Sequence, residues 1–406
     1  MAQRMDVTDR IVDADLCAGC GACAALAPKQ VAFGFDEEGF LRPRRTGPLS
    51  RKTAKTVMAV CPGGGQTAPR PHSDPLWGGY ASVHEGWAAD DSLRHAGASG
   101  GALSATCLWL LESGQVDGVY HVAADPENPT GNIMTISRSR ADLRARAASR
   151  YAPSAPLRDV PALLEKSERL AFVGKPCDVA GLRRWAAIDP RIDITFPVML
   201  SFFCAGVPSA AGADEIAHSL GVAPEDVAQF RFRGKGWPGA TEVIDRKGVR
   251  HAMSYAESWG GILSKRVQPR CRICADGTGL AADIAFADAW ETDTGGYPLF
   301  DEQHGRSLIL ARTSLGQSVL EAAMRGETVV ALPLSAEKIA AMQPGQVRRR
   351  RELLGRLAGR VLAGMPVPKY RGMGIWACGR MTPLTQSLRA MLGTARRAML
   401  RRRMAK

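Results

Sequence analysis

The sequence predicts an α/β protein, α+β overall, in which a small cysteine-rich segment precedes a larger domain with a mixed or mostly parallel sheet. Short apolar strands alternate with helical segments from residue 77 onward, and three closely spaced cysteines precede that alternation. At 406 residues, the chain is also too long for one ordinary hydrophobic core. The predicted parts are the N-terminal segment (1–70), the α/β domain (77–345) and a basic, partly helical tail (346–406).

The elements of the α/β domain follow a linker rich in proline and arginine that ends near Pro75. Ser99, Gly100 and Gly101 open a helix with apolar residues at helical spacing, and Gly114 ends it. Further helices are expected from about residue 178 and near residue 209. Apolar runs predict strands at 116–122, 170–173, 198–203, 241–244, 283–287, 308–311 and 329–332.

Three cysteines in the N-terminal segment have the spacing of a bacterial ferredoxin run. Cys17, Cys20 and Cys23 are separated by two residues each. In a bacterial ferredoxin a fourth cysteine, which serves another cluster, follows before a proline. In this chain Ala27 stands at that position. The remote Cys61, also followed by proline, completes a four-thiolate shell. We therefore predict a ferredoxin-like segment with one [4Fe–4S] cluster. Zinc, which paired cysteines also bind, is the alternative.

Four other cysteines indicate a second metal site. Cys177 follows one predicted strand and Cys204 ends the next, and ligands gather beyond the carboxyl ends of strands in open α/β sheets. Cys271 and Cys274 lie in a loop between arginines and would complete a second four-cysteine shell. The alternative is that Cys177 and Cys204 are small core residues, since free cysteine is often buried. The residues alone leave both open.

Other signals carry no predicted function. The glycines at 234–239 match a G-x-G-x-x-G pattern, but a strand rather than a helix follows, so they do not predict a dinucleotide site. Cys107 lies on the apolar face of its helix and is expected in the core. Cys378 in the tail receives no role.

The positive charge is concentrated in the tail. The net charge is +13, yet residues 348–406 carry 16 Lys and Arg against Glu352, so the rest of the chain is at −2. This distribution excludes nucleic acid as a partner of the whole protein. Apolar residues from Leu384 to Met399 recur at helical intervals among arginines. They predict a helix on anionic lipid or a docking site for an acidic ferredoxin, with a solvated or partly disordered tail as the alternative.

The compartment follows from the first residues and the thiols. Residues 1–16 contain no apolar signal region, and no stretch approaches the ~20 apolar residues that span a bilayer. Ten cysteines in such a chain predict reduced metal ligands rather than disulfides. We therefore expect a cytoplasmic protein, in peripheral contact with the inner face of the membrane if the tail binds lipid. A homo-oligomer and a subunit of a larger complex both remain compatible with the sequence.

Ordered motifs from residue 17 to about 290 resemble one family, the beta subunits of coenzyme F-420 hydrogenases and dehydrogenases. Relatives of this family in plants include 7-hydroxymethyl chlorophyll a reductase. The last ~115 residues match only loosely. The matching motifs are CAGCGAC (17–23), GASGGAL (97–103), LLESGQVDG (110–118), ASRYAPS (148–154), FVGKPCDVAGL (172–182), CAGVPS (204–209), FRFRGKGW (230–237), CRIC (271–274) and ADIAFADAW (282–290).

The resemblance implies an oxidoreductase with FAD and one or two [4Fe–4S] clusters, passing electrons between a ferredoxin-type or other electron-transfer protein and a small-molecule acceptor. It implies that Cys177, Cys204, Cys271 and Cys274 hold the second cluster. No catalytic acid or base and no deazaflavin-selective motif can be assigned. The segments that resemble flavin contacts are Ser99, Gly100, Gly101, Arg150, Tyr151, Lys175 and Pro176.

Two functions follow from these expectations. In the first, electrons enter at the N-terminal cluster, pass to the second cluster and reach FAD, which links one-electron and hydride chemistry. Arg270 and Arg272 are expected to raise the potential of the second cluster. The alternative is an electron-transfer subunit of a larger complex, or a polysaccharide-linked accessory protein, without catalysis of its own.

Overall fold

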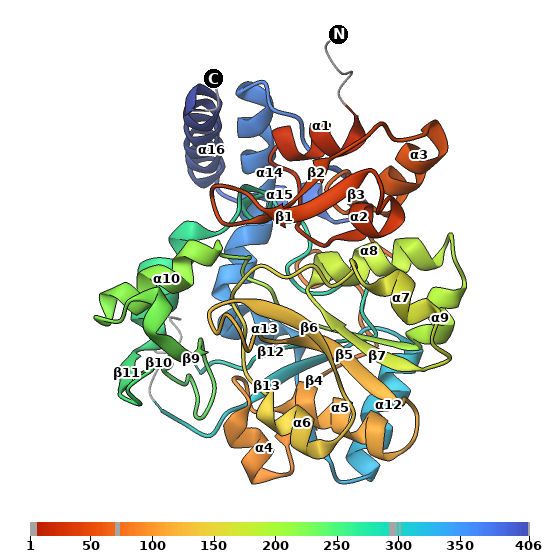
Figure 1. Ribbon diagram of the computed structural model, residues 1–406, viewed down its shortest axis with the longest axis vertical. Helices are drawn as coiled ribbons and strands as arrows, with labels where there is room; N and C mark the ends of the chain where they lie inside the picture. The colour runs from red at the N-terminus through yellow and green to blue at the C-terminus, as the bar shows by residue number, and fades with distance from the viewer. Residues whose placement is uncertain (1–5, 70–73, 292–298, 300–301, 405–406) are drawn as a thin grey trace.

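The computed structural model describes residues 6–69, 74–291, 299 and 302–404. An eight-stranded sheet with helices on both faces forms the lower part in Figure 1, and the N-terminal segment lies above it. Part of the predicted linker, residues 70–73, lies outside the described residues. The prediction of a mixed α/β fold is confirmed.

The large sheet is mixed, with a parallel centre and antiparallel edges. β12, β8, β7 and β5 pair in parallel, whereas β13, β4 and β14 at one edge and β6 at the other pair antiparallel. The strands across the sheet are β14 (Val329–Pro333), β4 (Ser82–Ala88), β13 (Ser307–Ala311), β12 (Ile284–Asp288), β8 (Val198–Phe202), β7 (Leu170–Gly174), β5 (Gly118–Ala124) and β6 (Asn132–Ser137).

Two apolar layers cover this sheet, as expected for parallel strands that read as continuous apolar runs. On β7, Leu170 and Phe172 face one layer, and Ala171 and Val173 face the other. The first layer contains α7 (Val160–Leu164), α8 (Pro176–Ala186) and α9 (Arg191–Thr195). The second contains α4 (Asp91–Ala96), α5 (Ala102–Glu112), α6 (Arg140–Ala145) and α12 (Ser314–Arg325).

A separate three-stranded antiparallel sheet lies to the side of the large sheet (Figure 1). It consists of β9 (Val227–Arg231), β10 (Thr241–Asp245) and β11 (Arg250–Met253), and α10 (Ala210–Ser219) packs against its core. The strand expected at 241–244 therefore forms, but outside the large sheet, because its partners β9 and β11 are its sequence neighbours. Short helical turns lie at Pro224–Asp226, Ala256–Ile262, Leu263–Arg266 and Ala336–Lys338.

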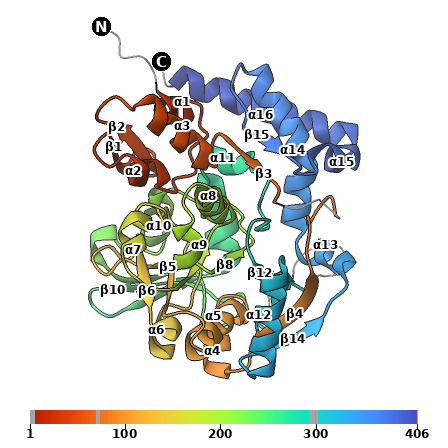
Figure 2. The ribbon, with the colours of Figure 1, turned by 90° about the vertical axis from the view of Figure 1, so that its right-hand side faces the viewer.

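The N-terminal segment covers one end of the α/β domain, above α8 and above α11 (Pro269–Arg272), as Figure 2 shows. It forms one antiparallel pair of strands, β1 and β2, and three helices. Its elements are α1 (Val7–Asp13), α2 (Ala22–Leu26), β1 (Val31–Phe35), β2 (Leu41–Arg45), α3 (Arg51–Val60) and β3 (Gly65–Thr67).

The tail packs against the N-terminal segment and is helical over most of its length. β15 pairs in parallel with β3, and the Arg401 guanidinium binds Asp15 at 3.0 Å. Gly355 and Gly359 on α14 allow close approach of α16, because a Cβ at either would lie within 2.5 Å of a backbone oxygen of α16. The remaining elements are α11 (Pro269–Arg272), α13 (Ile339–Met342), α14 (Pro344–Leu362), β15 (Lys369–Arg371), α15 (Ile375–Arg380) and α16 (Leu384–Met404).

Candidate functional site

Four N-terminal thiols line one cavity. Two lie on the loop between α1 and α2, where Gly19 and Gly21 adopt left-handed conformations at φ 73° and 85°. The third lies in α2, and the fourth caps the end of α3. Val57 and Phe33 form part of the apolar wall of the cavity. We name these residues the first thiol set: Cys17, Cys20, Cys23 and Cys61.

The backbone around the first thiol set is closely fitted. The Gly19 N–H donates to the Cys17 sulfur at 3.4 Å, and Arg184 donates to the Cys61 carbonyl at 3.0 Å. A Cβ on Gly63 would lie 2.6 Å from the carbonyl oxygen of Leu16 and 3.3 Å from the Cys61 sulfur. Residue 63 must therefore be glycine for Cys61 to reach the cavity in this geometry.

Burial governs the ionisation of the first thiol set. It raises the pKa of Cys20 well above the usual range, and the neighbouring Cys61 adds to that shift. Burial also raises the pKa of Cys17, although Arg42 opposes the shift. Thiolates in this cavity therefore require a bound cation, and soft metal centres are the cations that thiolates bind best.

Four further thiols lie at the carboxyl ends of two parallel strands. Cys177 is in the first turn of α8, directly after β7, and Cys204 follows β8. Cys271 and Cys274 lie in and just after α11, which sits beside α8 in Figure 2. Cys177 and Cys274 are 97 positions apart in the sequence, and the fold brings them to the same region. We name Cys177, Cys204, Cys271 and Cys274 the second thiol set.

The thiols of the second set interact electrostatically with one another. Burial raises the pKa of Cys204 to about 12; Cys271 and Cys274 add to the shift, and Arg349 opposes it. Burial likewise raises the pKa of Cys177, whose neighbours include Cys204 and Cys271. The structure therefore places Cys177 and Cys204 near the other two thiols of the set, and their role as metal ligands rather than small core residues stays a prediction.

In the part of the chain that the structure describes, no three Cys, His, Asp or Glu side chains form a group that could hold a metal ion. A zinc ion requires four ligands at about 2.0–2.3 Å. In a [4Fe–4S] cluster each thiolate binds a different iron. Binding of a metal centre by either thiol set therefore stays a prediction.

Gln268 connects the two thiol sets, a residue that the sequence did not single out. Its side-chain oxygen accepts from Arg42 at 3.0 Å, beside the first set. Its side-chain nitrogen donates to the Ala18 carbonyl at 3.3 Å and to the Cys271 sulfur at 3.4 Å. Gln268 is buried, so one amide bridges the two sites.

Arg270 is the second connection. Its guanidinium is buried, donates to the Pro62 carbonyl at 3.2 Å and to the Tyr370 hydroxyl at 2.7 Å, and interacts with Cys274. The N-terminal segment, the α/β domain and the tail therefore meet at one cation. This position fits the expectation that Arg270 acts on the second thiol set, whereas Arg272 donates to the Lys265 carbonyl at 2.9 Å.

The glycine loop expected to contact flavin is packed against the backbone. Gly100 and Gly101 adopt left-handed conformations at φ 71°, and a Cβ on Gly100 would lie 2.6 Å from the Gly305 carbonyl oxygen. The Ser99 carbonyl accepts a hydrogen bond from the Ser307 hydroxyl. Close packing therefore accounts for these glycines, and their contact with flavin stays a prediction.

Arg150 and Tyr151, also expected at the flavin, make extensive contacts within the protein. The Arg150 guanidinium donates to the Phe230 carbonyl at 2.9 Å and to three other oxygens. The Tyr151 ring packs against Trp259 with centroids 5.0 Å apart. Arg150 therefore has little donor capacity for a phosphate, and this geometry favours a structural role.

Lys175, the third expected flavin contact, lies next to the second thiol set. Its ammonium binds Asp178 at 2.6 Å and the Ser154 hydroxyl at 3.2 Å. Burial opposes the charge, but Asp178 and Cys177 outweigh it and raise the pKa of Lys175. Pro176 begins α8 directly after it. Lys175 is therefore a buried cation at the carboxyl end of β7.

A buried ion pair lies at the carboxyl end of β12 and was missed by sequence reasoning. The Arg233 guanidinium donates to both Asp288 oxygens, at 2.8 and 2.6 Å, and the Trp237 indole donates to the same carboxylate at 2.9 Å. The Trp237 and Trp290 rings stack with centroids 4.8 Å apart. The signal was present, since Arg233 and Asp288 fall within the motifs that carry the family resemblance.

Two other expectations are confirmed. The glycines at 234–239 precede β10, a strand, so they do not form a dinucleotide fingerprint. Cys107 is fully buried in the core under α5. Cys378 is buried as well, and its thiol donates to the Pro75 carbonyl at 2.9 Å.

Comparison with known proteins identifies relatives with the same domain. A coenzyme F420-dependent sulfite reductase from Methanocaldococcus jannaschii is 28% identical over 180 residues, which are 43% of this chain and 26% of that protein. The chain thus spans about a quarter of the length of that relative. The coenzyme F420 hydrogenase subunit beta from Methanococcus voltae is 24% identical, over 72% of this chain and 99% of the relative.

Two further similarities come from Methanosarcina. A subunit of the F(420)H(2) dehydrogenase of Methanosarcina mazei is 22% identical, over 77% of this chain and 83% of the relative. A chain in the solved F420-reducing [NiFe] hydrogenase complex from Methanosarcina barkeri is 20% identical and has a TM-score of 0.49. That similarity covers 68% of this chain and 94% of the other.

The family models match the α/β domain. The N-terminal model of the coenzyme F420 hydrogenase/dehydrogenase beta subunit matches residues 83–160, and the C-terminal model matches residues 167–337. Together these ranges cover more than half of the chain, including Cys177, Cys204, Cys271 and Cys274. The chain therefore belongs to the coenzyme F420 hydrogenase/dehydrogenase beta subunit family.

Proposed function

We propose that this protein is an iron–sulfur flavoprotein oxidoreductase. It passes electrons between a ferredoxin-type partner and an organic acceptor, either coenzyme F-420-like or another reducible small molecule. The observation that carries the proposal is the pair of neighbouring four-thiol sets bridged by Gln268. Membership of a redox family supports it, since relatives are named as F420-dependent hydrogenase, dehydrogenase and reductase proteins.

The two thiol sets would each hold one [4Fe–4S] cluster, which supplies one-electron transfer when bound. The Gly19 N–H and the Gln268 amide donate to cysteine sulfurs, and such bonds raise the potential of a bound cluster. Arg270 adds a buried positive charge near the second set. Gln268 and Arg270 thus both favour an added electron on the second set, as electron flow from the first set to the second requires.

FAD would supply the conversion between single electrons and hydride. Among the expected flavin contacts, Lys175 has the geometry that best supports the proposal, because its buried ammonium lies beside Cys177. Its Nζ atom would carry a proton next to the second thiol set, and its positive charge would compensate negative charge there. Ser99, Gly100 and Gly101 would contribute through backbone N–H groups at the start of α5.

Cofactor analysis of anaerobically purified protein tests the function. We expect about one FAD per chain together with broad cluster absorption, and reduction of the acceptor by a reduced ferredoxin. Lys175→Met should release FAD while leaving iron unchanged. Cluster absorption without any flavin would instead support the alternative of a non-catalytic electron-transfer subunit or a polysaccharide-linked accessory protein.

The outer surface of the tail supports a second proposal, peripheral contact with an anionic membrane. Trp376, Leu384 and Leu392 are 72%, 73% and 59% exposed, and no acidic residue follows Glu352. No helix formed by the described residues is long and apolar enough to cross a bilayer. An exposed face with apolar and arginine side chains is typical of a helix that lies on a lipid surface.

Vesicle sedimentation tests the membrane proposal. Binding should require anionic lipid, weaken at high salt and fall strongly in Leu388→Glu/Leu392→Glu. Ile194→Glu, which changes an exposed apolar residue on α9, is the control. Salt-dependent capture by an acidic ferredoxin without vesicle binding would assign the tail to the protein partner instead.

A further inference from the structure

A pocket of about 260 Å³ lies between α11, α14 and α16, outside both thiol sets. Arginines from three separate parts of the chain line it: Arg272, Arg356, Arg389 and Arg397. A basic tail in solvent would spread its charges, whereas here the fold brings them together. Bringing like charges together costs free energy unless an anion lies between them.

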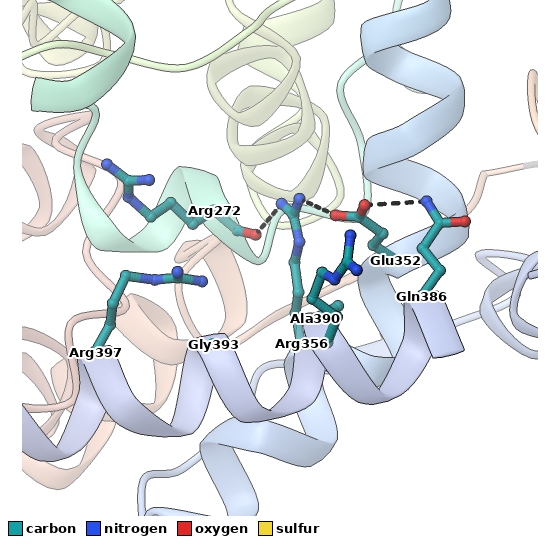
Figure 3. Close-up of a pocket in the computed structure, with 8 residues that line it drawn as sticks. Arg272, Glu352, Arg356, Gln386, Ala390, Gly393 and Arg397 are labelled. Carbon is teal, nitrogen blue, oxygen red and sulfur yellow. Dashed lines mark hydrogen bonds and ion pairs between the residues drawn. The ribbon is translucent and has the colours of Figure 1, made fainter. Parts of the chain in front are cut away.

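The charge in this arginine pocket is only partly compensated. In the described part of the chain, the one ion pair within the pocket joins Arg356 to Glu352 at 2.5 Å. The other oxygen of Glu352 accepts from Gln386 at 3.1 Å, so this carboxylate is already engaged. Figure 3 shows the Arg356 guanidinium between Glu352 and the Arg272 carbonyl. The pocket retains three positive charges in excess.

The pocket walls leave room for a ligand. Gly393 and Ala390 form part of the α16 side, and neither carries a long side chain. A Cβ on Gly393 would meet only the flexible guanidinium of Arg397, at 3.5 Å. The Arg397 guanidinium also donates to the Thr394 hydroxyl at 3.2 Å, which leaves most of its donors available.

We propose that the arginine pocket binds a compact polyanion with at least two phosphate or carboxylate groups. Guanidinium donors match the oxygen pairs of both groups, and this chemistry explains why arginine rather than lysine lines the pocket. The volume fits a diphosphate or a small tricarboxylate and not a protein segment. The site lies beyond the electron-transfer function proposed above.

The position of the pocket couples it to the second thiol set. Arg272 stands between Cys271 and Cys274, and Arg356 holds the Arg272 carbonyl at 2.9 Å. A bound polyanion would cancel positive charge beside those thiols and disfavour an added electron there. Binding should therefore lower the reduction potential of the second cluster, a consequence that rests on the proposed function.

Calorimetry on the full-length holoprotein tests the site, with pyrophosphate and citrate as probes at matched ionic strength. At least one should bind. Arg397→Gln should weaken that binding about tenfold, the value of one charge-assisted hydrogen bond. Gly393→Leu should abolish it by filling the pocket without changing the charge. Arg403→Gln removes one charge from α16 outside the pocket and should bind as the wild type does.

Several outcomes would overturn the site. They are no binding of either probe, equal binding in wild type and Gly393→Leu, and equal weakening by Arg397→Gln and Arg403→Gln. Binding of anionic vesicles without either free polyanion would assign these arginines to a lipid headgroup and also overturn it. Because the heat of binding does not depend on FAD or on either cluster, failure here is distinguishable from failure of the proposed function.

Discussion

The two thiol sets are built in opposite ways. The first takes three of its four thiols from seven consecutive residues at the end of the α1–α2 loop and the start of α2, so local glycine conformations position most of it. The second draws its thiols from the ends of β7 and β8 and from α11, so the large sheet must form before they meet. One site thus depends on local geometry and the other on the fold, and the predictions below exploit that difference.

Removing one thiol from either set should have the largest effect. Cys20→Ala and Cys274→Ala should each lose about half of the bound iron, because each leaves one incomplete shell. Both should abolish ferredoxin-linked activity, which requires both sets. Iron analysis and electron paramagnetic resonance give the readout. Cys378→Ala, outside both sets, is the control, and unchanged iron in Cys20→Ala would contradict the assignment of the first set.

Acid should weaken the α/β domain before the N-terminal segment, which has no histidine in residues 1–70. Burial lowers the pKa of His121 on β5 from 6.5 to about 4, so the unfolded state binds the proton more tightly. The contribution of His121 to the free energy of unfolding is therefore fully present above about pH 6.5 and is lost as the pH drops toward 4. The loss is about 3 kcal/mol from this group.

Denaturant unfolding between pH 4 and 7 measures this effect. His121→Gln should flatten the pH dependence, and His218→Gln, a substitution at an exposed position on α10, is the control. Equal pH slopes for the wild type and His121→Gln would show that another group is responsible.

A backbone substitution should damage the first thiol set alone. Gly63→Ala places a Cβ 2.6 Å from the Leu16 carbonyl oxygen and should cost about 2 kcal/mol by overpacking. Gly64→Ala is the matched control, since its Cβ crowds the flexible side chain of Met58 and makes an ordinary contact with the backbone, at 3.8 Å from the Cys61 carbonyl oxygen. Faster iron release from the first set in Gly63→Ala, but not in Gly64→Ala, is the expected result. Equal release would contradict the close fit.

The smallest effect should come from Gln268→Leu, which breaks the bridge but removes no thiol. Iron content should stay unchanged, while the second cluster loses a hydrogen bond worth about 1 kcal/mol. For a one-electron centre this lowers the reduction potential by roughly 40 mV. A redox titration checks the shift. An unchanged potential would show that Gln268 does not influence the second cluster.

The sequence predicted the strands of the large sheet well, because buried parallel strands such as β7 and β8 are short apolar runs between turns. It also found the antiparallel strands β13 and β14, but it missed β4 and β6, which are less completely buried than β7 and β8 and therefore have weaker apolar patterns. β10 was found but could not be assigned to its own sheet, since an apolar run does not specify its partner.

The candidate site divides in the same way. Cysteine spacing predicted the first set, and strand ends suggested where Cys177 and Cys204 meet. The role of Gln268 could not be found from spacing, because Arg42, its partner beside the first set, lies 226 positions away. Arg270 was expected at the second set, but not its contact with Pro62, which lies 208 positions away. The same holds for the tail, whose contact with β3 and α1 depends on the folded arrangement rather than on its own composition.

Iron and acid-labile sulfide in anaerobically reconstituted wild-type protein test the central claim most directly. Two complete shells predict about eight of each per chain, with Mössbauer parameters of [4Fe–4S] centres. About four of each would show that only one thiol set binds a cluster. Stoichiometric zinc with no iron would contradict the account of both.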